Sequence, residues 1–541
     1  MKRTALTLSC FFCIGSTLAA PATAPKLLVT LVVDQYSADL FTEYRPLYKE
    51  GLAQLANGVV FPRGHQSHAA TETCPGHSTI LTGARPARTG IIANDWQDPS
   101  LSRTNNGNET FTIYCAEKPG AAGSDARKQV ISPDALRVPT LGDRMKAVDS
   151  KARVVAVSGK DRSAVMLGGH NADLTLWWTN AGFVTYADQT SRVPASINGK
   201  INDAFRASYK KGMTASLPRE CASRSHASKI TDDFSVGTLQ AIKPESRRWR
   251  ASPALDSFTV DVALAALDEL QLGSRDTTDL LAISLAGTDY VGHYFGTEGA
   301  EMCAQQVALD HVIGRVLSEL AKRNISFAVV LTADHGGVDV TERNLERGVA
   351  AQRMDTALLP QNMNAALAKE LGTKGPLLLG SDEFTSDVYL SPKVSSAQRT
   401  LVLNAARRLY EGHPQVAAVF SKNEMIAAER PTGTVDEWSL LERAKASFDP
   451  QRSGDLIVLL KPYINIYHLP KNSETDYVTT HGSPWGYDRR VPIIFWWPGI
   501  QGFEQPTPIE TVDIAPTLAQ LIGLKIPADE IDGHALEIER K

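Results

Sequence analysis

The chain has 541 residues, of which 43% are hydrophobic and 21% are charged, in the proportions of an ordinary globular protein. A chain of this length can bury a large core without the help of disulfides. Its formal net charge of −4 argues against a general nucleic-acid binder, which usually carries a basic surplus, so we expect no nucleic-acid partner.

The N-terminus has the pattern of an export signal. A positive start at Lys2 and Arg3 is followed by an apolar run over 5–18 and by alanines that suit cleavage. The apolar run is too short, and too often interrupted by Ser and Thr, to be a membrane anchor, which needs ~20 apolar residues. We therefore expect a signal peptide over residues 1–20, a periplasmic or secreted location, and no membrane span in the mature chain.

Strand-like and helix-like segments alternate along the rest of the chain. This alternation predicts an α/β fold with a large, mostly parallel central sheet and helices on both faces. Ligands bind to such sheets beyond the carboxyl ends of the strands. The predicted strands are Leu27–Val33, Arg153–Ser158, Asp279–Leu285 and Phe327–Thr332, and helical patterns include Val260–Leu272 and Ala300–Lys322.

Two regions interrupt this alternation. Residues 175–250 are rich in Ser, Lys, Arg and aromatic residues with weak periodicity, and we interpret them as an inserted cap or lobe. Residues 375–475 contain strand-like pieces around the helical stretch 396–410, which predicts a smaller α+β lobe. The expected plan is thus one catalytic domain over 26–541 that carries both insertions.

Four cysteines remain once the signal peptide is removed: Cys74, Cys115, Cys221 and Cys303. Because the export signal implies an oxidising compartment, we expect two disulfides, for which three pairings exist. Our expectation is Cys74–Cys115 with Cys221–Cys303. The alternative is four buried thiols.

Aspartate and histidine residues follow the predicted strands, although each is a weak signal by itself. Asp34 ends the first strand and is also a candidate helix N-cap, a role that Ser37 could fill. Asp289 and His293 are four residues apart and can point to one side of a helical turn. A Gly-Gly step after the pair at 334–335 lets the backbone turn sharply and aim both side chains at one point. A single loop histidine stands before Gly482.

Taken together, these residues are a much more specific signal than any one of them. Three Asp and three His can form two three-ligand zinc sites, and two neighbouring metals can hold both oxygens of an in-line displacement. The six candidate ligands are Asp34, Asp289, His293, Asp334, His335 and His481.

The candidate nucleophile lies in the segment 71–77. Pro75 suits the first turn of a helix, which places Thr73 or Cys74 just before that helix, where anions are attracted. A threonine hydroxyl is a poor nucleophile until a metal helps to deprotonate it. The alternative for Thr73 is a plain N-cap. We expect His77 to be a packed or capping residue, and we favour a disulfide for Cys74 because a free thiol would compete for zinc.

These motifs resemble the alkaline phosphatase superfamily. The sequence is most similar to its threonine-nucleophile bacterial alkaline phosphatases, which are relatives of the nucleotide pyrophosphatases/phosphodiesterases. The resemblance covers nearly the whole mature chain, in the family's order. Besides Asp34, the matching segments are T-E-T-C-P-G-H-S-T-I-L-T-G at 71–83, G-I-I-A-N-D-W at 90–96, S-G-K-D-R at 158–162, D-Y-V-G-H at 289–293, T-A-D-H-G-G at 332–337 and H-G-S-P at 481–484.

The resemblance implies two Zn²⁺ ions and an alkaline phosphatase-like fold. One zinc ion would be held by Asp289, His293 and His481. The other would be held by Asp34, Asp334 and His335, with Thr73 bridging toward it as the catalytic nucleophile.

The resemblance also implies a phosphate cradle. Asn94 would donate a hydrogen bond to one phosphoryl oxygen, and Lys160 and Arg162 would contact the others. A planar arginine and a lysine point charge suit the dianionic group of a monoester, whereas a diester places a bulky group there. By themselves, Lys160 and Arg162 would be interpreted as an ordinary solvated turn.

The predicted function is an exported, zinc-dependent phosphomonoesterase that forms a phosphothreonine intermediate at Thr73 and acts on small-molecule phosphate esters. The alternative is a phosphodiesterase or nucleotide pyrophosphatase of the same superfamily. A third hypothesis is a catalytically dead phosphate- or metal-binding protein. The sequence leaves open whether the protein is a monomer or a homodimer.

Overall fold

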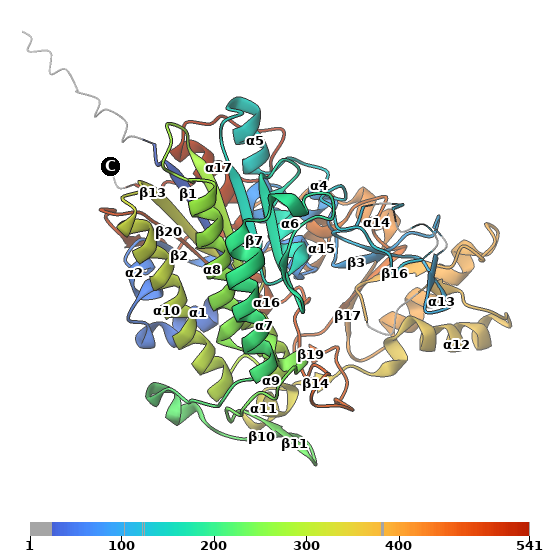
Figure 1. The fold of residues 1–541 in the computed structure, drawn as a ribbon. Coiled ribbons are helices and arrows are strands. Elements are labelled where there is room, and N and C mark those ends of the chain that lie inside the picture. The colour runs from blue at the N-terminus through green and yellow to red at the C-terminus, as the bar shows by residue number, and fades with distance from the viewer. Residues whose placement is uncertain are drawn as a thin grey trace, which may run out of the picture.

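The computed structural model of the protein describes residues 24–101, 103–118, 120–121, 123, 125–379 and 384–539 (Figure 1). The predicted signal peptide over residues 1–20 lies outside these described residues. Within the described ranges, no helix has both the length and the apolar character that crossing a membrane requires.

A ten-stranded sheet lies at the centre of the described structure. Its middle strands run parallel in the order β8–β7–β12–β1–β13, while β20 and β9 run antiparallel near the two edges. Leu27 of β1 lies opposite Asp279 of β12 and Phe327 of β13, so these three strands end at one edge of the sheet. The strands are β1 (Leu27–Val33), β2 (Val59–His65), β7 (Val154–Ser158), β8 (Leu174–Thr179), β9 (Gly182–Val184), β12 (Asp279–Leu285), β13 (Phe327–Thr332), β20 (Arg490–Trp496), β21 (Phe503–Glu504) and β22 (Ile509–Glu510).

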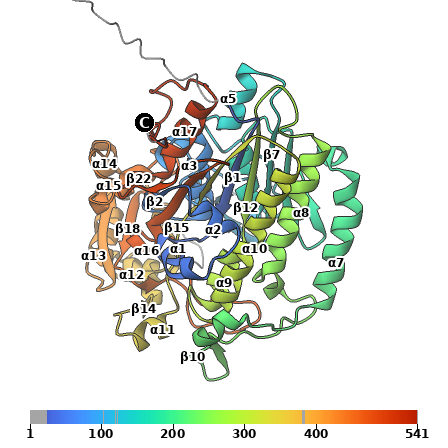
Figure 2. The ribbon, with the colours of Figure 1, turned by 90° about the vertical axis from the view of Figure 1, so that its left-hand side faces the viewer.

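Alternate residues of the strands enter two separate hydrophobic cores, because successive side chains of a strand point to opposite faces. In β1, Val29 and Leu31 face one core, while Leu28 and Val32 face the other. Both faces are therefore covered by helices, as Figure 2 shows, and the predicted α/β fold with a mostly parallel central sheet is confirmed. One face carries α1 (Ala38–Tyr44), α2 (Gly51–Leu55), α8 (Pro253–Glu269), α9 (Gly287–Phe295) and α10 (Ala300–Lys322), and the other carries α3 (Thr73–Thr82), α5 (Leu141–Val148), α6 (Asp161–Gly168) and α17 (Ile514–Leu521).

The predicted elements agree closely with the observed ones. Three of the four predicted strands have the predicted bounds, and the strand expected from Arg153 begins at Val154. The helix expected over 300–322 is α10. The helix expected over 260–272 begins earlier, because Pro253 opens the first turn of α8, and it ends at Glu269.

The region over 175–250 packs against the outer side of the main core. It contains α7 (Asn202–Lys211), the hairpin of β10 (Ser228–Thr231) and β11 (Phe234–Val236), and short 3₁₀ and π turns. Trp249 is fully buried among Phe205, Trp178 and Phe258 of α8, so these aromatic side chains join the region to the helix layer. In Figure 2, α7 lies beyond α8 as seen from the sheet. The predicted bounds of a separate cap stay a prediction.

A smaller antiparallel sheet forms a second body with its own core. Its strands lie in the order β15 (Leu378–Leu379), β16 (Asp387–Leu390), β18 (Leu456–Leu460) and β17 (Val416–Ser421), and α12 (Pro360–Leu371) and α13 (Arg399–Glu411) cover it (Figure 1). The core begins at Met354, before the predicted start of the lobe at residue 375, whose bounds stay a prediction. The remaining named elements are α4 (Pro86–Thr89), α11 (Thr341–Glu346), α14 (Lys422–Ala427), α15 (Leu440–Ser447), α16 (Gly486–Arg489), β3 (Asp95–Gln97), β4 (Arg103–Asn105), β5 (Asn108–Thr110), β6 (Thr112–Tyr114), β14 (Gln352–Arg353) and β19 (Ile464–Asn465).

The four cysteines of the described chain form the two expected disulfides. Cys74 is bonded to Cys115, with Cα atoms 6.5 Å apart, and Cys221 is bonded to Cys303, with Cα atoms 5.7 Å apart. The first bond joins α3 to the end of β6, and the second joins the 175–250 region to α10.

Candidate active site

The six predicted metal ligands gather at the carboxyl edge of the parallel strands. Asp34 follows β1 and Asp334 and His335 follow β13, which lies beside it in the sheet. The first turn of α9 carries Asp289 after β12, and its last turn carries His293. A loop before α16 brings in His481 from far along the sequence.

Asp34 does not cap the helix that follows it, which was the alternative role for this residue. The N-cap of α1 is Ser37, whose Oγ accepts a hydrogen bond from the Leu40 backbone N–H at 3.0 Å. The carboxylate of Asp34 is fully buried and faces the other ligands instead. The next residue, Gln35, adopts a left-handed backbone with φ of 61°, a conformation that costs a non-glycine residue about 1–2 kcal/mol.

The ligand atoms form two overlapping groups. In the first, the Nε2 atom of His335 lies 3.3 Å from Asp334 Oδ2 and 3.6 Å from Asp34 Oδ1. In the second, Asp289, His335 and His481 also lie within 4.8 Å of one another. The His335 ring stacks on the His481 ring with centroids 3.6 Å apart, so it stands between the two groups.

His293 approaches the second group through Asp289. Its Nε2 atom lies 3.3 Å from Asp289 Oδ1, and the same oxygen is 3.5 Å from His481 Nε2. The structure therefore brings all six predicted ligands together, and their division into two sets of three stays a prediction.

The three histidines are oriented for metal binding by backbone carbonyls. Each Nδ1 atom lies 2.8–2.9 Å from a carbonyl oxygen, namely that of Thr479 for His293, Gly336 for His335 and Thr71 for His481. Because Nδ1 must carry a proton to make these bonds, Nε2 is the atom that each ring offers to a metal when it is neutral, and in all three it faces the carboxylates.

Several of these buried atoms have no hydrogen-bond partner among the described residues: Asp34 Oδ1, Asp289 Oδ1, Asp334 Oδ2 and His335 Nε2. Burying a polar atom without a partner is costly. A divalent cation satisfies carboxylate oxygen and imidazole nitrogen at once, and both are good zinc ligands. The donor set therefore fits metal binding.

Burial and neighbouring charges set the protonation of these groups. Burial, together with repulsion from Asp334, raises the pKa of Asp34 well above its usual range. Burial also acts to raise the pKa of Asp289, but His293 and Lys160 outweigh it and hold that pKa well below the usual range. Burial lowers the pKa of His335 well below its usual value, which keeps the imidazole neutral, as a ligand must be.

Thr73 is the first residue of α3 rather than its N-cap, which is Glu72, so the capping alternative for Thr73 does not hold. Pro75 accordingly occupies the third helical position. We call the segment after β13 that carries Asp334 and His335 the ligand loop. The backbone of α3 approaches this loop very closely at Gly76, where an added Cβ would lie 2.0 Å from the Asp334 carbonyl oxygen. Only glycine allows this approach, which places the hydroxyl of Thr73 beside the ligands.

The two glycines after His335 act through close approach rather than through an unusual turn. Neither Gly336 nor Gly337 has a positive φ. An added Cβ would lie 2.1 Å from the Tyr487 carbonyl oxygen at Gly336 and 2.0 Å from Gln35 Nε2 at Gly337. Close approach of other parts of the chain is thus a reason for these glycines that the sequence did not indicate.

Two cations stand beside the Thr73 hydroxyl. Lys160 is the N-cap residue of α6, and its Nζ atom lies 3.4 Å from Thr73 Oγ1, while Arg162 Nη2 lies 3.5 Å from the same oxygen. Lys160 also pairs with Asp289 Oδ2 at 2.5 Å and with Asp34 Oδ2 at 2.8 Å. Burial acts to lower the pKa of Lys160, but these two carboxylates outweigh it and raise that pKa, so the lysine is charged at neutral pH.

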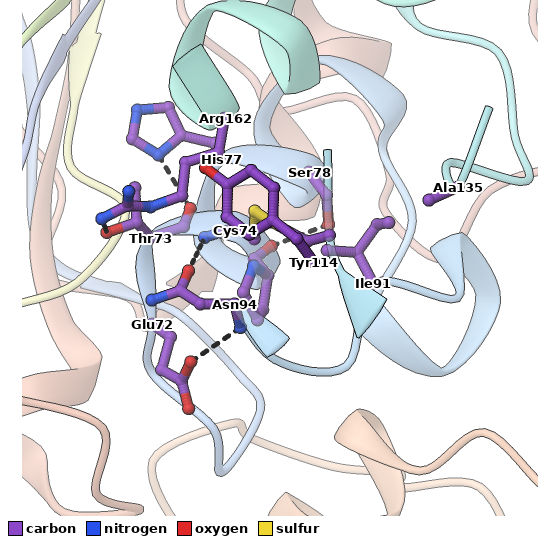
Figure 3. Close-up of a disulfide and its surroundings, with 12 residues drawn as sticks. Glu72, Thr73, Cys74, His77, Ser78, Ile91, Asn94, Tyr114, Ala135 and Arg162 are labelled. Atoms are coloured by element: carbon purple, nitrogen blue, oxygen red, sulfur yellow. Dashed lines mark hydrogen bonds between the residues drawn. A yellow bond between two sulfur atoms is a disulfide. The ribbon is translucent and has the colours of Figure 1, made fainter. Parts of the chain in front are cut away.

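Asn94 lies on the other side of the α3 N-terminus, as Figure 3 shows. Its side-chain oxygen accepts a hydrogen bond from the Cys74 backbone N–H at 2.9 Å, and its own backbone N–H donates to Glu72 Oε2 at 2.7 Å. Since the amide oxygen is occupied, the amide nitrogen is the group that Asn94 can offer to a ligand.

Sequence reasoning missed the role of His77, which we expected only to pack or cap. Its Nδ1 atom lies 2.9 Å from the Thr73 carbonyl oxygen and 3.0 Å from Asp334 Oδ2, and its Nε2 atom lies 2.9 Å from Ser284 Oγ. The spacing of four residues from Thr73 on a helix was the available signal. Its contact with Asp334 could not be seen from the sequence.

A cavity of about 330 Å³ opens over this cluster. Its lining includes Asn94, Arg162, Asp289 and His481, together with residues between Leu460 and Tyr467. A volume of this size accommodates a small molecule.

The chain is similar to known proteins over most of its length. Residues 28–484 match the family model described as type I phosphodiesterase / nucleotide pyrophosphatase. Alkaline phosphatase PhoK of Sphingomonas sp is 46% identical over 524 residues, which are 96% of this chain and 92% of PhoK. Alkaline phosphatase PhoD of Zymomonas mobilis is 44% identical over 524 residues, which are 96% of this chain and 89% of PhoD. The crystal structure of alkaline phosphatase PafA superimposes with a TM-score of 0.80 at 25% identity, covering 96% of this chain and 99% of PafA.

Proposed function

The chain belongs to the type I phosphodiesterase / nucleotide pyrophosphatase family, and from that premise we propose that it is an alkaline phosphatase that hydrolyses phosphate monoesters through Thr73 and two zinc ions. The substrates are small-molecule phosphate esters. The observation that carries the proposal is the pair of cations, Lys160 and Arg162, within 3.5 Å of the Thr73 hydroxyl.

Three side chains hold the phosphoryl group in this proposal. Asn94 donates a hydrogen bond from its amide nitrogen, and Lys160 and Arg162 donate charged hydrogen bonds to the other oxygens. Charged hydrogen bonds of this kind contribute about 1.5–3 kcal/mol each. A monoester offers a dianionic group with no second ester arm, which suits two cations better than the single charge of a diester does.

The proposed ligands divide as the sequence suggested, with Asp289, His293 and His481 for one ion and Asp34, Asp334 and His335, approached by Thr73, for the other. When bound, two divalent cations supply Lewis-acid charge that favours the ionised Thr73 hydroxyl and the departing alcohol oxygen. Zinc is the metal we propose, because nitrogen and oxygen ligands of this kind suit it.

Thr73 acts as the nucleophile. Its Oγ atom forms a bond to phosphorus in line with the ester oxygen, the bond from phosphorus to that oxygen breaks, and the alcohol leaves with a proton. Water then cleaves the phosphothreonine to phosphate and free Thr73. During both steps, Asn94, Lys160 and Arg162 hold the three oxygens that do not react, and the N-terminal end of α3 adds its positive dipole.

The test is a pair of rates measured on purified enzyme. An aryl phosphate monoester should be hydrolysed much faster than the methyl diester of the same aryl alcohol, and Thr73→Ala should abolish monoester turnover. Chelation should remove activity and zinc should restore it, with metal content determined by mass spectrometry. Faster cleavage of the diester would favour a phosphodiesterase, and an active Thr73→Ala variant would exclude the nucleophile. Zinc binding without turnover of either ester would favour the catalytically dead hypothesis.

We also propose that the protein is exported to the periplasm or beyond the cell. Two buried disulfides support this location, because such bonds persist mainly in oxidising compartments. Fractionation of cells that express the full chain, or a chain lacking residues 1–20, tests it. The same preparations allow size measurements in solution that separate a monomer from a homodimer.

A further inference from the structure

The disulfide between Cys74 and Cys115 lies immediately beside the proposed nucleophile. Cys74 follows Thr73 in α3, and Cys115 follows β6 at the end of the segment 94–115, which we call the ribbon. β3 and β6 of the ribbon pair as antiparallel strands, with Asp95 opposite Tyr114. Asn94 and Cys115 therefore stand side by side where the ribbon leaves and rejoins the rest of the protein.

Asn94 makes three polar contacts at the base of the ribbon, one within the ribbon and two to the N-terminal end of α3. The Asn94 carbonyl oxygen accepts a hydrogen bond from the Cys115 N–H at 2.9 Å. The Asn94 side-chain oxygen accepts from the Cys74 N–H at 2.9 Å, and its backbone N–H donates to Glu72 at 2.7 Å (Figure 3). Both hydrogen-bond donors to Asn94 thus belong to the two residues that the disulfide joins.

The rest of the ribbon is attached less directly. It is separate from the central sheet, because its strands pair with each other in two short two-stranded sheets, and its one further bridge among the described residues joins Thr104 to Asp125. Apolar side chains such as Ile113 and Trp96 pack it against α3 and α6 in a small core that contains both cysteines. Apolar packing has no directional requirement, whereas a hydrogen bond weakens steeply with misalignment.

We propose that the Cys74–Cys115 disulfide is a positioning device for Asn94, which fixes the Asn94 amide relative to the Thr73 hydroxyl. The bond links Cys74 to Cys115, the two residues whose backbone N–H groups donate hydrogen bonds to Asn94. One covalent link thereby sets the distance between the ribbon and Thr73. This inference rests on the proposed function, in which Asn94 donates to the phosphoryl group.

Tyr114 extends the same link toward Arg162. Its hydroxyl donates a hydrogen bond to Asp161 Oδ1 at 2.7 Å, and the same oxygen accepts from the Arg162 backbone N–H at 2.8 Å. Tyr114 precedes Cys115 in the chain. If the base of the ribbon moves, Tyr114 moves with it, and the change is passed through Asp161 to Arg162. The main effect falls on Asn94, to which the disulfide-bonded residues donate directly.

The experiment compares two disulfide-free variants. Cys74→Ser/Cys115→Ser removes the bond beside Asn94, and Cys221→Ser/Cys303→Ser is the matched control. The two bonds close loops of 41 and 82 residues, so the model of unfolded-chain entropy assigns the control at least as large a loss of stability. Neither Cys221 nor Cys303 is among the described residues that line the cavity.

We expect the first variant to lose about tenfold or more in kcat/KM for an aryl phosphate monoester and to bind inorganic phosphate about tenfold more weakly as a competitive inhibitor, with metal content unchanged. One correctly placed donor is worth about 10²–10³ in kcat, which sets the upper limit. The control should stay within about twofold of the parent in kcat/KM and in its affinity for inorganic phosphate. Equal losses in the two variants would overturn the proposal, because they would report general destabilisation.

A double-mutant cycle with Asn94→Ala identifies the residue through which the disulfide acts. In an Asn94→Ala background, removing the Cys74–Cys115 bond should cost less than about threefold more, since the amide it positions is already gone. An undiminished loss in that background would overturn the role given to Asn94. Should the serine pair fail to fold, Cys74→Ala/Cys115→Val retains apolar side chains in the core and gives the same comparison.

Failure of the inference and failure of the proposed function give different results. If Asn94→Ala itself leaves monoester turnover unchanged, Asn94 does not bind the phosphoryl group, and both its proposed role and the inference are wrong. If Asn94→Ala lowers turnover and the Cys74–Cys115 variants do not, only the inference is overturned.

Discussion

Gly76→Ala tests whether α3 must lie directly against the ligand loop. An added Cβ at residue 76 would lie 2.0 Å from the Asp334 carbonyl oxygen and 2.8 Å from the Asp334 Cβ. To reach ordinary van der Waals contact at 3.4 Å, the two backbones would have to separate by about 1.4 Å. Neither side can give way easily, because every residue of α3 is buried and Asp334 is anchored by the central strand β13.

Separating the two backbones would displace both Thr73 and the proposed metal ligand Asp334. Thr73 lies one turn before Gly76 on the same helix, so its hydroxyl moves relative to Asp334 and the cations. A misplacement of about 1 Å costs about 10²-fold in rate, and overpacking a core costs about 1–3 kcal/mol of stability. We therefore expect kcat/KM to fall by about a hundredfold, metal to dissociate faster, and the free energy of unfolding to fall by about 1–3 kcal/mol.

The assay needs monoester kinetics, metal content after dialysis against a chelator, and denaturant unfolding. Gly199→Ala is the matched control, because residue 199 lies in the helical turn Ile197–Ile201 with no atom within 4 Å of an added Cβ. The control should keep its activity and metal and be as stable as the parent or slightly more so. A Gly76→Ala enzyme with unchanged kcat/KM and metal content would refute the argument that this contact sets the site.

Three further variants probe the side chains around Thr73 and Asp334. Lys160→Ala/Arg162→Ala should lower monoester kcat/KM by about 10²–10⁴-fold and diester kcat/KM by much less, and equal losses would remove the basis for monoester preference. His77→Gln should weaken metal retention by about tenfold in a chelator competition, because His77 contacts Asp334, and parent-like retention would show that the contact is dispensable. Tyr114→Phe removes the hydroxyl bonded to Asp161 and should lower kcat/KM by about two- to tenfold with the unfolding midpoint nearly unchanged, whereas a parent-like rate would separate Tyr114 from Arg162.

The sequence predicted the central sheet well because its strands are short, continuous apolar runs that are buried on both faces. Leu27–Val33 and Asp279–Leu285 have no competing helical pattern, and their bounds agree with β1 and β12. The candidate ligands could be predicted for the same reason, since Asp34 comes directly after β1 and Asp334 comes two residues after the end of β13. Parallel strands in matching register carry those two residues to one edge whatever the rest of the chain does.

Contacts between distant segments could not be predicted in this way. The sequence gives no sign that Gly76 must meet Asp334, because that need arises only when two backbones approach to a distance that excludes a Cβ. The position of His335 between two ligand groups depends on the stacking of His481, which comes from a loop far along the chain. The aromatic residues around Trp249 likewise show no useful periodicity, although they are buried against α8.

Charge balance gives a physical reason for the choice of a monoester. Metal ligands must be deprotonated, so with the proposed ions bound the buried carboxylates of Asp34, Asp289 and Asp334 would all be ionised. Together with the cations of Lys160 and Arg162, which lie beside them and beside Thr73, these side chains would carry an excess of one negative charge. The two divalent ions that we propose turn this into an excess of three positive charges. A dianionic phosphoryl group and an ionised Thr73 neutralise all three, whereas a diester leaves one positive charge uncompensated. Because charge is poorly screened in a buried site, this difference favours the monoester at the moment of attack.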